Sequence, residues 1–272
     1  MTRPTVTPRG EQALVGPGAG GGTVRVGNTV RRPPHRAPDA MIEVLRHLEA
    51  VGFDGAPRVL GRDEAGRWVL TYIPGDAPMP PYAAWVAATH PLASVATLLR
   101  RYHDAVAGYR PPPDLQWPTV PPRQHVGSLV GHLDVSMANV VFRQGRAVAL
   151  IDFEEVGLVT CVWDVARTVR HWVPLIDPVD LPVELRPLGG RHVQRLGLFA
   201  DSYRLDDAKR RQLVDTVLLN ADASYERMRR GAATGHVGYT REWTGHAATR
   251  NRRGRDWVEA HRGELERALG GS

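Results

Sequence analysis

Short runs of apolar and β-branched residues, separated by turn residues, fill the first third of the chain. Gly27-Asn28 separates the first two runs, and Asp63-Glu64-Ala65-Gly66 separates the next two. The four runs cover residues 23–26, 29–32, 57–60 and 68–73. Apolar runs that flank a Gly, Asn or Asp turn are typical of β-hairpins. The pattern predicts two hairpins, and residues 40–50, with apolar side chains at helical spacing, predict a helix between them.

Beyond a proline-rich link at residues 77–82 the pattern changes to helical spacing. Apolar side chains recur every three to four residues in 91–109, 161–172 and 193–230. This periodicity predicts helices with one buried face. We therefore expect an α+β fold with two lobes. Residues 1–74 would form a small antiparallel β-sheet N-lobe, and residues 75–272 would form a larger, mostly α-helical C-lobe.

One further hairpin is predicted inside the helical part. Residues 140–142 and 147–151 are β-rich and flank the turn Arg143-Gln144-Gly145-Arg146. When these strands fold back on one another, Asn139 before the first strand and Asp152 after the second come side by side.

The residues around this hairpin have the spacing of a phosphoryl-transfer site. His132-x-Asp134-x4-Asn139 precedes the hairpin, and Ile151-Asp152-Phe153-Glu154 closes it. Kinase-type catalysis needs a carboxylate to orient the attacking hydroxyl, an amide oxygen on Mg²⁺, and a second carboxylate that joins the metal to the nucleotide phosphates. Asp134 is thus the predicted catalytic residue, and Asn139 and Asp152 are the predicted metal ligands. Asp and Asn in loops are more often turn formers, but the hairpin and the apolar-flanked Asp152 favour catalysis.

These motifs resemble those of the aminoglycoside phosphotransferases and their relatives, small-molecule kinases with a protein-kinase-like fold. The similarity is carried by His132, Asp134, Asn139, Leu150-Ile151-Asp152-Phe153-Glu154 and Trp163-Asp164-Val165-Ala166, and is strong from about residue 125 to 175. The resemblance implies a bilobal fold and an ATP- or GTP-dependent phosphotransferase that uses Mg²⁺. It also implies that Asp164 supports the catalytic loop, together with His132.

The resemblance further implies where the nucleobase binds. Leu70-Thr71-Tyr72-Ile73-Pro74-Gly75 is similar to the hinge between the lobes, so backbone groups of Thr71, Tyr72 and Ile73 would contact the base. Leu133 departs from the family pattern, which more often has Gly or Asn there. We expect this bulky residue to reshape the acceptor pocket.

Two features of the N-lobe are candidates for phosphate binding. The run Gly16-Pro17-Gly18-Ala19-Gly20-Gly21-Gly22 precedes the first hairpin, so Gly20, Gly21 and Gly22 could bring backbone N–H groups close to the phosphates. A flexible linker is the plainer interpretation of such a run.

The second feature is an arginine where protein kinases carry a phosphate-binding lysine on the third strand. Arg31 occupies the matching place, and Arg32 is the competing choice. Glu43 on the following helix is the natural ion-pair partner for Arg31, although alignment to the family places Met41 nearer that position.

Charge and composition limit the other possibilities. The 272 residues carry a net charge of +6, and the single cysteine excludes an internal disulfide and fits a reducing compartment. We see no signal peptide or membrane-spanning run, so we expect a soluble cytoplasmic protein. Arginines are densest at residues 241–262, where a solvated helix face is favoured over a nucleic-acid site because no nucleic-acid motif accompanies them.

The sequence thus predicts a kinase for a hydroxylated small molecule, either an aminoglycoside or another antibiotic-type or metabolite alcohol. Its acceptor pocket would be built by helices after residue 175. A polycationic aminoglycoside needs clustered carboxylates, and the available ones are Glu154, Glu155, Asp177, Asp180, Glu184 and Asp201. The alternatives are an inactive nucleotide-binding regulatory protein and, with less support, a basic nucleic-acid-binding protein. The oligomeric state stays open.

Overall fold

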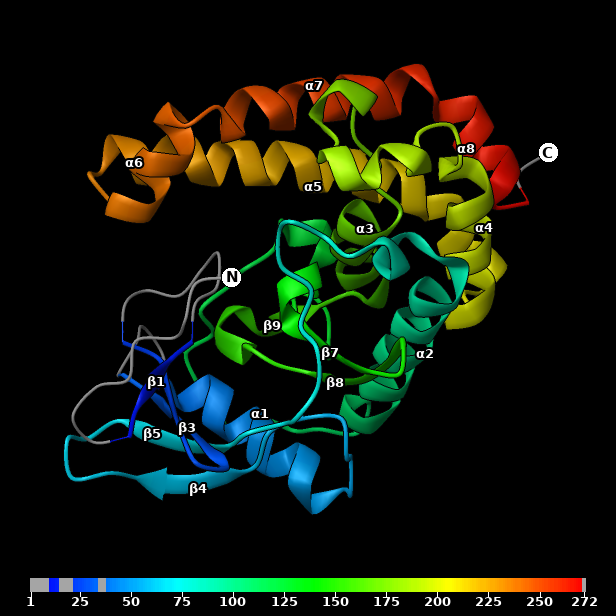
Figure 1. The fold of residues 1–272 in the computed structure, drawn as a ribbon. Coiled ribbons are helices and arrows are strands. Elements are labelled where there is room, and N and C mark those ends of the chain that lie inside the picture. The colour runs from blue at the N-terminus through cyan, green and yellow to red at the C-terminus, as the bar shows by residue number, and fades with distance from the viewer. Residues whose placement is uncertain (1–9, 15–21, 34–37, 271–272) are drawn as a thin grey trace.

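The computed structural model describes residues 10–14, 22–33 and 38–270. Its N-terminal part is a five-stranded antiparallel sheet with the strand order β1-β2-β3-β5-β4. The strands are β1 (Gln12–Ala13), β2 (Val24–Val26), β3 (Thr29–Arg32), β4 (Val59–Arg62) and β5 (Trp68–Thr71). Both predicted hairpins are confirmed, and Val26 pairs with Thr29 around Gly27, whose positive φ of 58° suits a tight turn. Helix α1 (Pro38–Ala50) lies against the sheet (Figure 1).

The remainder of the described chain is mostly helical. Helix α2 (Thr89–Val106) packs on α4 (His192–Tyr203) and on the hairpin of β7 (Val140–Arg143) and β8 (Arg146–Leu150). Strands β6 (Leu129–Gly131) and β9 (Gly157–Val159) pair beside α3 (Cys161–Trp172). The last helices are α5 (Asp207–Ala233), α6 (Val237–Thr244), α7 (Ala247–Ala260) and α8 (Arg262–Ala268). Helices α5 and α7 run side by side on the far side of the hairpin from the sheet (Figure 1).

The α+β class and the division into a sheet part and a helical part are therefore confirmed. The position of the lobe boundary, between residues 74 and 75, remains a prediction. Residues 193–230, which have a helical pattern, form most of the two helices α4 and α5. The chain turns at Arg204, whose φ is 62°, and Asp206 then begins α5 by accepting a hydrogen bond from the Lys209 backbone N–H at 2.9 Å.

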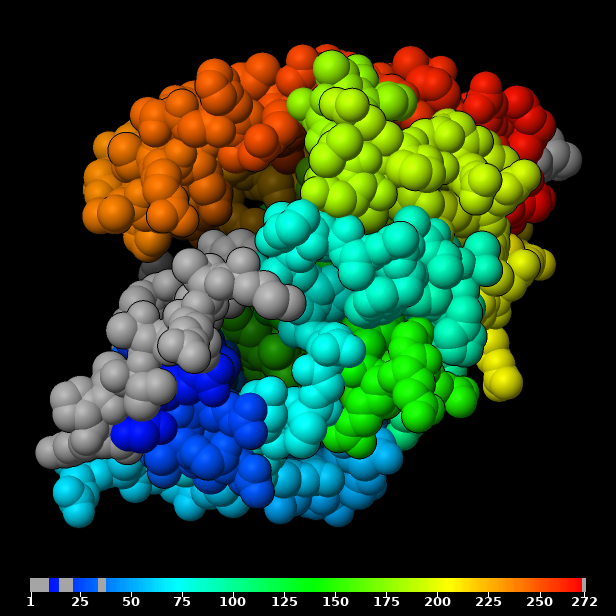
Figure 2. Space-filling view, viewed as in Figure 1, coloured from blue at the N-terminus to red at the C-terminus, as the bar shows by residue number. Residues whose placement is uncertain are grey.

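A hollow separates the sheet from the helices. In the space-filling view dark green atoms lie recessed between the blue N-terminal strands and the cyan link that follows β5 (Figure 2). Within the described ranges, we find no helix with the length and apolar character needed to cross a membrane.

Candidate active site

The β7–β8 hairpin positions the two predicted metal ligands. Val140 pairs with Leu150, and one residue further out the Ile151 N–H donates to the Asn139 carbonyl oxygen at 2.9 Å. Asn139 and Asp152 therefore flank the open end of the hairpin, and both line the same cavity. This juxtaposition is the one that the turn at residues 143–146 predicts.

Asp134 lies in the loop between β6 and β7, held by Asn139. The Asn139 side-chain nitrogen donates to the Asp134 carboxylate at 2.6 Å and to the Asp134 carbonyl oxygen at 3.0 Å. Because the amide nitrogen faces Asp134, the amide oxygen of Asn139 points to the other side, where no described residue donates to it. Burial raises the pKa of Asp134, while the neighbouring Arg167 and His132 oppose that rise. The arrangement leaves one half-buried carboxylate beside one free amide oxygen.

Asp164 braces this loop from the start of α3. Its carboxylate accepts the backbone N–H groups of His132 at 2.8 Å and Leu133 at 2.9 Å, and it also bonds the His103 Nε2 at 2.9 Å. The side chains of Asp164 and His103 are 0% and 4% exposed. Burial alone would lower the pKa of His103, but the hydrogen bond to Asp164, the contact with Cys161 and their charges together outweigh it and raise that pKa to about 9. The predicted contact between Asp164 and the loop is therefore present, although it runs through backbone N–H groups.

His132 connects the loop that carries Asp134 to the residues around Asp152. Its Nε2 lies 3.1 Å from the Ile151 carbonyl oxygen, and its ring packs on Phe153 with ring centres 4.5 Å apart. Burial lowers the pKa of His132, which favours a neutral ring that donates to that carbonyl. The side chain thus fixes the spacing between the two loops.

The expectation that Leu133 reshapes the acceptor pocket is wrong. Leu133 is fully buried and packs with Val159 and Trp163, behind the loop and outside the lining of the cavity. Its backbone has a positive φ of 63°, a conformation that Gly or Asn adopts more easily. The departure of Leu133 from the family pattern therefore affects the backbone, where leucine adopts an unfavourable conformation. The apolar burial of its side chain offsets that cost.

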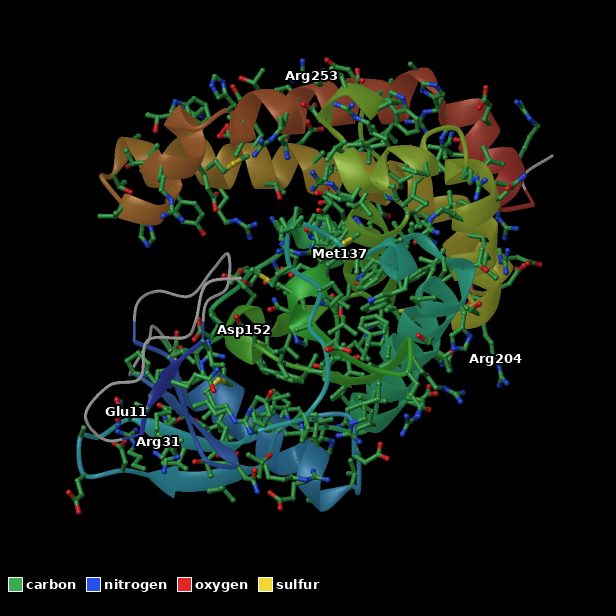
Figure 3. All side chains as sticks on the ribbon, viewed as in Figure 1. Glu11, Arg31, Met137, Asp152, Arg204 and Arg253 are labelled. Atoms are coloured by element: carbon green, nitrogen blue, oxygen red, sulfur yellow. The ribbon has the colours of Figure 1, made fainter. Side chains whose placement is uncertain are left out.

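The expectation that Arg31 lies beside the predicted metal ligands is also wrong, because Arg32 lies there instead. Arg32 pairs across the sheet with the buried Trp68, on the face that looks toward the helices, and side chains alternate between faces along a strand. Arg31 accordingly points to the outer face, where it bonds the Thr29 hydroxyl at 2.6 Å and lies 3.6 Å from Asp63. Figure 3 shows Arg31 beside Glu11, apart from Asp152.

Arg32 instead reaches the second metal-ligand candidate. Its Nη2 donates to Asp152 at 3.0 Å and to Glu154, while its buried Nε has no hydrogen-bond partner among the described residues. Asp152 itself has a left-handed backbone, with φ 68° and ψ 66°, which turns its carboxylate toward the sheet. The Arg32 guanidinium and the carboxylate of Asp152, the second metal-ligand candidate, are thus in direct contact.

The proposed partner Glu43 does not pair with either arginine of β3. It forms an ion pair at 3.3 Å with Arg46, on its own helix, while Met41 is buried beneath the sheet. The predicted ion pair between Glu43 and Arg31 is therefore wrong. The carboxylate partner of the strand arginine comes from Glu154, which the sequence shows beside Asp152.

The glycine run and the hinge are tested only in part. Gly20 and Gly21 lie outside the described residues, and Gly22 has a positive φ of 121° beside Pro33. In the hinge, the Thr71 N–H already donates to Arg58 and the Tyr72 N–H to Asn28, so these two groups are not available to a base. The N–H of Ile73 has no backbone acceptor in the described part of the chain, and base contact there remains a prediction.

A cavity of about 660 Å³ opens in front of Asp134, and its helical wall is rich in arginine. Arg167 and Arg170 come from α3, Arg227 from α5 and Arg250 from α7. The sequence reasoning missed these residues and placed the pocket only after residue 175. The signal that could have found Arg167 and Arg170 is their helical spacing directly after Asp164.

Most of the carboxylates considered for a polycationic acceptor are engaged elsewhere. Among the six, only Asp180 lines the cavity. Glu155 bonds Thr119 at 2.9 Å, Asp177 caps a short helix through the Val179 N–H, and Asp201 pairs with Arg210. The structure thus lacks, in the parts it describes, an acidic cluster at this wall.

Comparison with solved structures identifies the fold. A choline/ethanolamine kinase family protein from Mesorhizobium loti superposes with a TM-score of 0.60 at 16% identity, covering 91% of this chain and 88% of that chain. The GDP complex of aminoglycoside 2'-phosphotransferase-IIIa superposes with a TM-score of 0.52 at 13% identity, covering 91% and 88%. The resemblance seen in the motifs is confirmed: the fold is that of the small-molecule kinases with a protein-kinase-like architecture.

At the level of sequence the relationship is more specific. No protein-family model matches the chain. The trifolitoxin immunity protein of Rhizobium leguminosarum bv. trifolii is 33% identical over 262 residues, which span 92% of this chain and 97% of that protein. The chain therefore belongs to the same family as the trifolitoxin immunity protein.

Proposed function

We propose that this protein is a phosphotransferase that moves the γ-phosphate of ATP or GTP to a hydroxyl group of a small molecule. The observation that supports it best is the contact of Asn139 with Asp134, beside Asp152 in one cavity. Three groups that phosphoryl transfer requires are thereby assembled by one hairpin. An antibiotic-type acceptor is supported by the immunity role in the name of the relative.

Asp134 has the position of the group that orients the acceptor. It lines the cavity, is held by Asn139 and is braced from behind by the hydrogen bonds to Asp164. In the transfer, the acceptor oxygen forms a bond to the γ-phosphorus while the bond to the β,γ-bridging oxygen breaks. The nucleoside diphosphate leaves with that electron pair, and the hydroxyl proton passes to Asp134 and then to water.

Mg²⁺ fits the donors that the site offers. The free amide oxygen of Asn139 and the carboxylate of Asp152 are hard oxygen ligands, and Mg²⁺ in kinases is held by few protein groups together with substrate phosphates. When bound there, it would neutralise charge on the β- and γ-phosphates. Arg32, held against Asp152 and Glu154, would supply the second cation for the phosphates.

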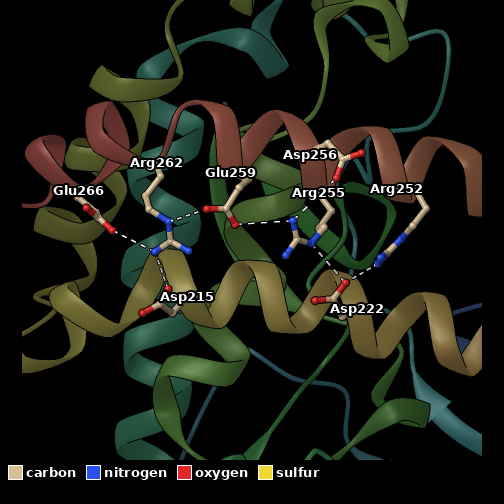
Figure 4. Close-up of polar contacts among 8 residues, drawn as sticks. All are labelled: Asp215, Asp222, Arg252, Arg255, Asp256, Glu259, Arg262 and Glu266. Atoms are coloured by element: carbon tan, nitrogen blue, oxygen red, sulfur yellow. Dashed lines mark hydrogen bonds and ion pairs between the residues drawn. The ribbon is translucent and has the colours of Figure 1, made fainter.

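The basic C-terminal segment supports a structural role for its arginines. Arg252, Arg255 and Arg262 on α7 and α8 pair with Asp222 and Asp215 on α5, as Figure 4 shows. Further contacts join Arg255 to Glu259 and Arg262 to Glu259 and Glu266. Their charge is thus largely used within the protein. This favours the kinase proposal over a nucleic-acid-binding protein.

The proposal is tested by measuring Mg²⁺-dependent nucleotide binding and γ-phosphate release or transfer, from ATP and GTP in parallel. Asp152→Asn removes one ligand charge and should raise the Mg²⁺ concentration needed for half-maximal nucleotide binding at least tenfold. Asp114→Asn, in an exposed loop outside the cavity, is the matched control and should behave as wild type. Nucleotide binding that is independent of Mg²⁺ and unchanged in Asp152→Asn would refute the proposal.

A further inference from the structure

The wall of the cavity opposite the sheet carries more positive charge than its own carboxylates balance. Arg167, Arg170, Arg227 and Arg250 all line it. Among the carboxylates, Asp180 is held by a two-pronged ion pair with Arg253, at 2.8 and 2.9 Å. Arg253 lies on the outer helix α7 (Figure 3). The ion pair therefore neutralises the charge of Asp180 from the side that faces away from the cavity.

The remaining acids of the cavity do not offset the arginines. Asp134 and Asp152 serve the catalytic and metal roles in the proposed function. Glu242 is exposed on α6, at the rim. The helical wall of the cavity is therefore cationic.

Several donors on this wall have no acceptor. Arg167 forms no ion pair or side-chain hydrogen bond with any described residue, and the only ion pair of Arg227 is a 3.8 Å contact with Glu155. The buried Nε of Arg227 has no partner among the described residues. Buried polar groups normally find a partner. Open donors on a cavity wall therefore point to a ligand that supplies acceptor oxygens.

Asn220 gives an independent indication of the same ligand. This residue on α5 is 2% exposed and lines the cavity. Its oxygen accepts from Arg170 at 3.0 Å, which leaves its side-chain nitrogen, buried and without a partner in the described structure, as a further donor. Arg170, Arg227 and Asn220 thus present only N–H groups.

Repulsion among the arginines of this wall also favours a ligand that supplies negative charge. Burial, Arg167 and Arg227 lower the pKa of Arg170 to about 10. An entering anion would relieve this repulsion, whereas an entering cation would increase it.

We propose that the acceptor is an anionic alcohol, whose carboxylate or phosphate group binds Arg167, Arg170 and Arg227 while its hydroxyl faces Asp134. This inference rests on the proposed function and names its substrate class. Guanidinium groups bind carboxylates and phosphates alike with paired hydrogen bonds. The wall therefore requires an oxyanion, which is either planar, as in a carboxylate, or tetrahedral, as in a phosphate. Polycationic aminoglycosides are disfavoured by the same wall.

The test uses six-carbon polyols that differ in one terminal group and therefore in charge: gluconate, glucitol 6-phosphate, glucitol and glucamine. Their binding to the full chain, saturated with Mg²⁺ and a non-hydrolysable nucleoside triphosphate, is measured by calorimetry. We expect gluconate or glucitol 6-phosphate to bind at least tenfold more tightly than glucitol and glucamine, and the two anions separate a carboxylate from a phosphate site. Arg227→Gln should remove that preference, with at least a tenfold loss for the anion.

Arg230→Gln, three residues further along α5 and 77% exposed, is the matched control and should stay within twofold of wild type. Equal or tighter binding of glucamine would overturn the anionic acceptor while leaving the kinase proposal intact. If no polyol binds, inorganic sulfate is titrated instead. Sulfate binding that is weakened in Arg227→Gln but not in Arg230→Gln supports the inference. Sulfate binding that is unchanged in Arg227→Gln overturns it. Loss of nucleotide binding itself would refute the proposed function separately.

Discussion

Replacement of the strand arginines tests the register of β3 and the phosphate site together. Arg32 is held between Asp152 and Glu154 with 13% of its side chain exposed, whereas Arg31 faces the outer side of the sheet. A hydrogen bond to a charged group contributes about 1.5 to 3 kcal/mol. Arg32→Ala should therefore weaken nucleoside triphosphate binding by roughly 10- to 150-fold, at 1.4 kcal/mol for each tenfold.

The matched control is Arg31→Ala, one residue away. Arg31 contacts Thr29 and Asp63 on the other face of the sheet, away from Asp152, so its triphosphate affinity should stay within about twofold of wild type. Adenosine affinity should change in neither variant, and Arg32→Lys should recover only part of the loss because an ammonium cannot form the paired contact. Calorimetry in the presence of Mg²⁺, with either ATP or adenosine as the ligand, measures the affinities of all three variants. A triphosphate-selective defect in Arg31→Ala, with Arg32→Ala normal, would refute this account of the site.

Two other substitutions test the support of the loop. Asp164→Asn, which breaks the buried contact with His103 and weakens two backbone hydrogen bonds, should lower the free energy of unfolding by about 3 to 5 kcal/mol in urea titrations at pH 6. Because the pKa of His103 is raised to about 9, the stability from this pair is complete below the unfolded pKa of about 6.5 and is lost as the pH rises through 9. The wild type should thus lose more stability than Asp164→Asn between pH 6 and pH 9.5, and equal losses would contradict the pairing. Leu133→Gly relieves a positive φ that costs about 1 to 2 kcal/mol but removes a fully buried side chain that contributes about 3 to 5, so thermal unfolding should show a net loss of about 1 to 4 kcal/mol. A more stable variant would mean that backbone strain outweighs burial there.

The sequence predicted best where local pattern and chemistry coincide. The turn at residues 143–146 sets the register of the β7–β8 hairpin, so the neighbourhood of Asn139 and Asp152 followed from spacing alone. The bracing of the loop by Asp164 followed from the family resemblance. Both depend on contacts between segments that lie close in sequence or carry a distinctive motif.

What the sequence could not predict depends on which face a side chain takes. Residues Trp68, Val69 and Leu70 are all apolar, so the strand that pairs with β3 carries no alternation to show that Arg32 faces inward. The arginines of the cavity wall come from α3, α5 and α7, and their meeting depends on how helices far apart in sequence pack. Helix packing of that kind leaves no local signal in the chain.

The most direct measurement of the central claim is a comparison of binding and turnover in Asp134→Asn. The substitution keeps the size of the side chain and can still contact Asn139, but it removes the carboxylate that orients the hydroxyl. With γ-labelled ATP or GTP and Mg²⁺, we expect turnover to fall by at least about a hundredfold, while calorimetry shows nucleotide affinity within about threefold of wild type. Asp114→Asn should match wild type in both. Unchanged turnover in Asp134→Asn would contradict the assignment of this site as a phosphotransferase centre.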